Sequence, residues 1–76
     1  MTSPILILDS RNEGYRAVVT QLSDLVFRVE VERLIESLDA GGVKRGEFWS
    51  VLSGSNSLTD SLESARNLAH EKLNLL

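Results

Sequence analysis

The sequence has no cysteine, and it contains one histidine (His70) and one proline (Pro4) in 76 residues. Without cysteine the chain has neither disulfides nor thiolate metal ligands, and a single histidine excludes an imidazole-rich metal cluster. We therefore expect no metal and no cofactor. A chain this short buries only about 60% of the surface that its unfolded form exposes, so its stability is marginal without further support. Association is the support that remains, and we expect a homodimer.

An excess of positive charge is also missing, since the formal net charge is −3. Proteins that bind nucleic acid normally present a basic face to the phosphates, so nucleic acid is not an expected partner. The longest apolar run, "ILIL" at 5–8, is too short to cross a bilayer or to form the core of a signal peptide. These features predict a single small cytoplasmic domain over residues 1–76 with no membrane contact.

Three short apolar runs are typical of strands: "ILIL" at 5–8, "VFRVEV" at 26–31 and "EFWSVL" at 47–52. The second run decides the fold. A helix continued through it would be apolar nearly all round. A strand instead separates an apolar face from a charged face. The apolar face is Phe27, Val29 and Val31, and the charged face is Arg28, Glu30 and Glu32.

The segments between these runs have helical spacing. Apolar residues recur at i, i+3, i+4, i+7 and i+10 from Tyr15 to Leu25, which predicts a helix over 15–25. A second helix is expected over 32–40, stopped by the glycines at 41 and 42. A third is expected over 58–75, with Ser57 as its N-cap.

Each predicted strand is thus followed by a helix, and this βαβαβα order predicts a three-stranded parallel sheet. "ILIL" is apolar on both faces and is expected at the centre, whereas "FRVEVE" at 27–32 has one polar face, as an edge strand does. The strand order is then 2-1-3. The alternative is an all-α protein that forms a helical hairpin or a dimeric bundle. Its helices would lie near 4–12, 15–40, 44–53 and 58–75.

The stretch "ILILD" at 5–9, its loop and the segment after it resemble the first βα unit of flavodoxin-like domains, including response-regulator receivers. The resemblance covers the first half of the chain and implies half of a flavodoxin-like fold. Receivers have a pair of acidic residues after this strand that help to hold a metal ion, but here only Asp9 is present and Ser10 follows it. No later phospho-acceptor aspartate is found, so phosphotransfer is not inferred.

Two loops could bind a small anion or a nucleotide in such a sheet. Asp9 and Ser10 end the expected central strand, where open α/β sheets place functional groups. The loop 53–57 would lead into a helix N-terminus, whose free N–H groups attract negative charge. This candidate anion loop consists of Ser53, Gly54, Ser55, Asn56 and Ser57. A small-anion or nucleotide-binding domain is therefore the competing hypothesis for function.

A third hypothesis is DNA binding, since the stretch 42–63 has features of a helix-turn-helix motif. However, Trp49 occupies a tightly packed position of that motif, and residues 56–63 contain no Arg or Lys to contact bases or phosphates. DNA binding is the weakest of the three.

The preferred hypothesis is a non-enzymatic protein-binding module, a regulator, inhibitor or adaptor of another protein that acts as a homodimer. The sequence has no recognisable group of catalytic residues, but it has aromatic and apolar residues of the type found at interface hot spots. If 47–52 is a strand, Phe48 and Trp49 point to opposite faces. Leu75 falls off the apolar stripe of the last helix and is expected to be exposed. The predicted contact residues are Phe48, Trp49, Leu68, Leu73, Leu75 and Leu76.

Overall fold

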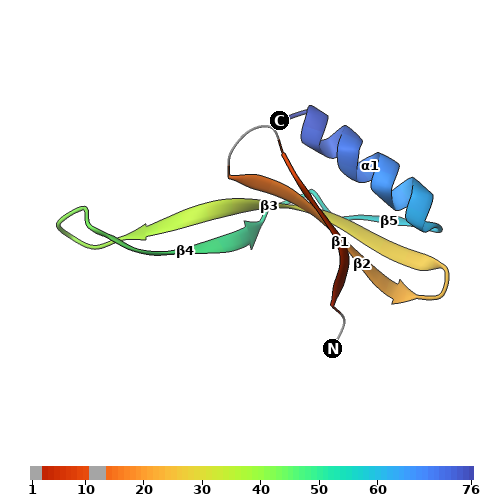
Figure 1. Ribbon diagram of the computed structural model, residues 1–76, viewed down its shortest axis with the longest axis horizontal. Helices are drawn as coiled ribbons and strands as arrows, with labels where there is room; N and C mark the ends of the chain where they lie inside the picture. The colour runs from red at the N-terminus through yellow and green to blue at the C-terminus, as the bar shows by residue number, and fades with distance from the viewer. Residues whose placement is uncertain (1–2, 11–13) are drawn as a thin grey trace.

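The protein is an antiparallel sheet with one helix packed on one of its faces (Figure 1). The computed structural model describes residues 3–10 and 14–76. Four strands follow one another in the order β1-β2-β3-β4, and a short fifth strand pairs with β3. The elements are β1 (Pro4–Asp9), β2 (Tyr15–Ser23), β3 (Val26–Leu38), β4 (Lys44–Val51), β5 (Ser57–Thr59) and α1 (Leu62–Asn74).

The parallel βαβαβα fold, with its flavodoxin-like order 2-1-3, is therefore wrong, and so is the all-α alternative. The apolar runs at 5–8 and 26–31 are strands, as predicted, and so is the run at 47–52 except for its last residue, Leu52. The error lies in the two segments between them, since 15–23 forms β2 and 32–38 continues β3. Without helices at these places the connections are hairpins, and all the strand pairs are antiparallel.

Strand β2 shows why helical spacing was misleading. Its four central residues, from Ala17 to Thr20, are all buried, so the strand is apolar on both faces at that point. Such a run also satisfies an i, i+3, i+4 pattern. Three of the four residues, Val18, Val19 and Thr20, are β-branched, a composition that favours strands because the branched side chain packs well on a pleated surface.

The glycines at 41 and 42 end a strand and not a helix. They lie in the turn between β3 and β4, where Gly42 has a φ of 80° that other residues rarely adopt. The Asp39 carboxylate closes the turn by accepting hydrogen bonds from the N–H groups of Gly41 and Val43, each at 2.9 Å. The result is a long hairpin in place of the predicted helix over 32–40.

The positions of the strands in the sheet are the reverse of those expected. "ILIL" lies in β1 at an edge, and β3, which contains "FRVEVE", is central. Leu6 and Leu8 pack against the core, whereas Ile5 and Ile7 are each 46% exposed. An apolar strand need not be central, because the second face of this sheet has no helix over it among the described residues.

The core lies between α1 and the sheet. As predicted, the apolar face of 26–31 points inward: Phe27, Val29 and Val31 are buried and their charged neighbours are not. The helix contributes Ala65, Ala69 and Leu73. It begins after Ser61, whose side chain accepts a hydrogen bond from the Ser64 N–H, so the predicted N-cap at Ser57 is four residues too early.

The molecule is elongated because the β3–β4 hairpin projects beyond the part of the sheet that α1 covers (Figure 1). Its extents are 48 × 29 × 19 Å. The radius of gyration is 14.1 Å, compared with about 11 Å for a compact domain of this length.

Candidate interaction surfaces

The projecting hairpin presents Phe48 and Trp49 on opposite faces, as the strand interpretation predicted. Trp49 pairs across the ladder with Leu34, and Phe48 pairs with Ile35. The Phe48 side chain is 54% exposed. Trp49 is only partly exposed, since the Arg16 guanidinium lies over its ring, 4.1 Å from the ring centroid. The two aromatic residues therefore differ in role: Phe48 is free for a partner, and Trp49 is already packed against its own chain.

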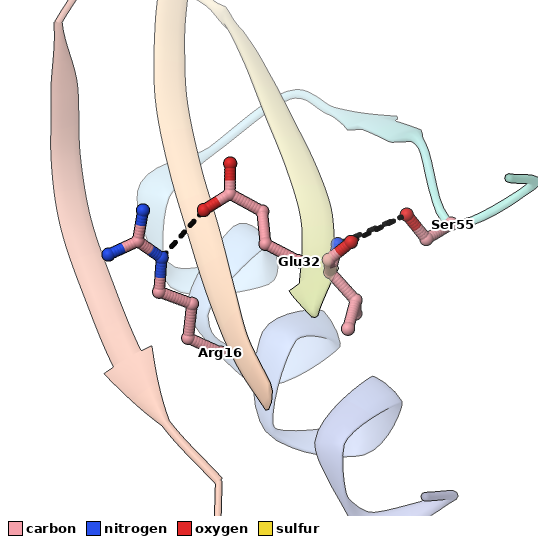
Figure 2. A network of polar contacts seen from close by, with 4 residues as sticks. Arg16, Glu32 and Ser55 are labelled. Atoms are coloured by element: carbon pink, nitrogen blue, oxygen red, sulfur yellow. Dashed lines mark hydrogen bonds and ion pairs between the residues drawn. The ribbon is translucent and has the colours of Figure 1, made fainter. Parts of the chain in front are cut away.

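Arg16 connects the base of the hairpin to strand β2. Its Nε donates a hydrogen bond to Oε1 of Glu32 at 2.6 Å, from the neighbouring strand (Figure 2). Arg16 and Glu32 are opposite each other in the β2–β3 register, and the guanidinium also contacts Trp49. A cation over an aromatic face contributes about 0.5–1 kcal/mol at an exposed site. This cluster orients the hairpin where it leaves the helix-covered sheet.

The tip of the hairpin combines charge pairs with exposed apolar side chains. Lys44 forms ion pairs with Glu47 and, at 3.7 Å, with Glu36. The hydrogen bond to Glu47 is the main reason that the pKa of Lys44 is raised above 10.5. Beside these charges, Leu38 is 58% exposed and Val43 is 60% exposed. A polar rim around apolar side chains is the usual composition of a protein interface.

The predicted contact surface on α1 is only partly available. Leu73 is buried in the core and Leu68 packs against it, so neither can serve as an open contact. Leu75 is 82% exposed, which confirms the exposure expected for it, and Leu76 is 44% exposed. The exposed leucines are therefore the two that follow the end of α1 at Asn74, and the helix itself presents no leucine stripe.

The loop 53–57 does not lead into a helix, because Ser57 begins β5. It joins β4 to β5, which follow each other along one edge of β3. Ser55 lies in the gap: its Oγ accepts a hydrogen bond from the Val31 N–H at 3.1 Å (Figure 2). The same hydroxyl donates to the Leu52 C=O at 2.8 Å. This hydroxyl thus substitutes for a missing strand residue beside β3.

Asp9 and Ser10 are far from this loop in the sheet order. They end the edge strand β1, and strands β2 and β3 separate them from the β4–β5 connection. The structure does not bring the two predicted anion-binding segments together, and the helix N-terminus that was to attract the anion lies at Ser61. Nothing in the geometry supports a shared anion or nucleotide site.

The described residues contain no group of three or more His, Cys, Asp or Glu side chains placed to hold a metal ion. The only histidine, His70, is on the exposed side of α1. Within residues 3–10 and 14–76, no helix combines the length and apolar character needed to cross a membrane.

The sequence interpretation missed Arg16, Leu38 and Val43 because it placed them in or beside helices. Once 15–23 is taken as a strand, its alternation puts Arg16 on the same face as its cross-strand neighbour Glu32. The fold defines the class of the protein as an antiparallel sheet covered on one face by a C-terminal helix. A comparison with protein-family models, with curated proteins and with solved structures finds no match to this chain.

Proposed function

We propose that the chain is a small non-enzymatic protein-binding module, a regulator, inhibitor or adaptor that acts as a homodimer and contacts another protein through the β3–β4 hairpin. The observation that supports this is an imbalance of apolar side chains. Among the described residues, twelve large apolar side chains are exposed, whereas nine apolar residues are buried and three of those nine are alanine. A surface of this kind is typical of a protein that associates.

The hairpin is the best contact surface because it projects from the helix-covered sheet and carries exposed apolar residues along its length. Four of the twelve lie in it or in its turn: Leu38, Val43, Phe48 and Val51. Phe48 is the anchor, since aromatic side chains bury a large area and are enriched at interface hot spots. The Arg16 cluster holds the base of the hairpin, which reduces the entropy lost when a partner binds.

A cytoplasmic location is part of the same proposal. The chain has no cysteine and gains nothing from an oxidising compartment. Fractionation of cells that express the tagged chain tests this point separately from binding.

Affinity capture from native lysate, followed by quantitation of each captured protein, tests the hairpin. Phe48→Ala removes the exposed anchor without opening a cavity, so we expect its melting temperature to stay near that of the wild type. Capture of the specific partner should fall about tenfold or more, because hot-spot truncation costs about 2 kcal/mol.

Leu22→Ala is the matched control. Leu22 is 40% exposed in β2 and lies outside the hairpin, so its truncation should leave the yield unchanged. Equal recovery of the same partners by Phe48→Ala and by the control would contradict the hairpin as the contact surface.

A further inference from the structure

The outer edge of β1 has no strand beside it among the described residues. In the strand order β1 has β2 as its one neighbour, and α1 packs over β2, β3 and β5. A hollow continues from this edge onto the helix, where Ile5 and Leu6 face Leu62 and Arg66. Glu63 also lines this hollow, so its wall is partly apolar and partly charged. The backbone of β1 is thus open to a second strand.

Alternation of the ladder shows which backbone groups point outward. The Ser10 N–H donates to the Tyr15 C=O at 3.1 Å, so these two residues form a hydrogen-bonded pair with β2. Bonded and non-bonded pairs alternate along an antiparallel ladder. Leu8 and Leu6 therefore also bond inward, and the N–H and C=O groups of Ile7 and Asp9 are directed to the open edge.

The two edges of the sheet differ in how they are protected. The outer strand at the opposite edge, β4, contains Lys44, Arg45 and Glu47, charged residues of the kind that discourage edge-to-edge pairing. Strand β1, "PILILD", has four aliphatic residues and no lysine or arginine. Pro4 and the register shift between Pro4 and Leu6 protect the start of β1, but the stretch from Leu6 to Leu8 has neither feature. An apolar edge of this kind is a template for another strand.

We propose that β1 pairs with β1 of a second copy of this chain, antiparallel about a two-fold axis at Ile7. In this register Ile7 faces Ile7 of the other copy, so the outward N–H and C=O groups of the two Ile7 residues pair with each other. Asp9 faces Ile5, which lies at the register shift between Pro4 and Leu6. This inference rests on the homodimer in the proposed function and specifies how the copies join.

The charge of the edge suits a second copy. The antiparallel register places the two Asp9 carboxylates four residue steps apart, about 13 Å, which exceeds the Debye length of about 8 Å at physiological salt.

Sedimentation equilibrium over a range of protein concentrations tests the dimer and its axis. Ile7→Lys and Ile7→Glu each place two like charges opposite each other at the axis, so each variant alone should dimerise about tenfold or more weakly. An equimolar mixture of the two variants should re-form a dimer, because the introduced charges are then of opposite sign. Leu25→Lys, on an exposed residue of the β2–β3 turn, should dimerise like the wild type.

Amide hydrogen exchange identifies the edge directly. The Ile7 and Asp9 amides should become protected as concentration rises, while the outward-facing Trp49 amide of β4 should not change. A monomer at all concentrations, undiminished dimerisation of both Ile7 variants, failure of the mixture to recover or protection confined to β4 would each overturn the proposal. A monomer at all concentrations would also contradict the homodimer of the proposed function, whereas the other outcomes would overturn only the β1 pairing. The capture result with Phe48→Ala tests the hairpin separately from all of them.

Discussion

The hydroxyl of Ser55 offers the sharpest test of the fold. Ser55→Ala removes the acceptor of the Val31 N–H, and Val31 is only 3% exposed, so water has little access to that amide. A buried donor left without a partner costs about 1–3 kcal/mol. For a domain of this size 1 kcal/mol lowers the melting temperature by about 4–8 °C, which gives an expected decrease of about 5–20 °C.

Thermal unfolding followed by far-UV circular dichroism measures this decrease, and urea unfolding gives the free energy. Ser53→Ala is the matched control, since Ser53 is an exposed serine of the same loop. The control should stay within about 0.5 kcal/mol of the wild type. Equal stability of the two variants would refute the structural role of Ser55. A stability difference that appears only when phosphate is added would instead indicate an anion site in the loop.

Three further predictions concern the helix, the Arg16 cluster and the hairpin tip. Ser61→Ala should destabilise the protein by about 1 kcal/mol, measured by urea unfolding, because it removes the N-cap of α1; no loss would place the cap elsewhere. Arg16→Ala should shift the fluorescence of Trp49, the sole tryptophan, because its ring loses the guanidinium that covers it; an unchanged spectrum would contradict that contact. Glu47→Gln should lower the pKa of Lys44 toward 10.5 in an NMR titration of its side chain. Because the folded pKa is raised, the stabilising contribution of this pair is present below pH 10.5 and is lost as the pH rises through the folded value.

The sequence was most informative where apolar and charged residues alternate. The run 26–31 has a period of two that no single helix face can accommodate, and it forms a strand with the predicted face buried. The opposite orientations of Phe48 and Trp49 follow from the same period. Alternation is a direct consequence of strand geometry, so the predicted faces of a strand are correct even when the predicted order of the strands is wrong.

Periodicity failed where both faces of a strand are apolar. The residues from Ala17 to Thr20 are buried on both faces of β2, and their spacing is compatible with a helix as well as with a strand. That error replaced a hairpin by a helical crossover, and together with the helix wrongly predicted over 32–40 it turned an antiparallel sheet into a parallel one. Long-range pairing decided the structure here, and no local pattern encodes it.

The predictions for individual residues also succeeded where local spacing was sufficient and failed where long-range contacts decided. The exposure of Leu75 was correctly expected from its place off the apolar stripe. The role of Ser55 was not, because its partner Val31 lies 24 residues away in sequence and is reached only after β3, β4 and β5 have assembled. A serine whose hydroxyl bonds to the backbone between two strands cannot be told from an anion-binding serine by its neighbours in sequence.

Strand β3 is fully covered only after the segments that follow β4 have been synthesised. It pairs with β2 and β4, but the elements that complete it, β5 and α1, come from the last 20 residues in sequence. During synthesis the first four strands emerge before anything can shield Phe27 and Val29 from water. The partly synthesised chain thus exposes apolar side chains that favour aggregation. Truncation before Ser61 would remove α1 and leave the core face of the sheet uncovered.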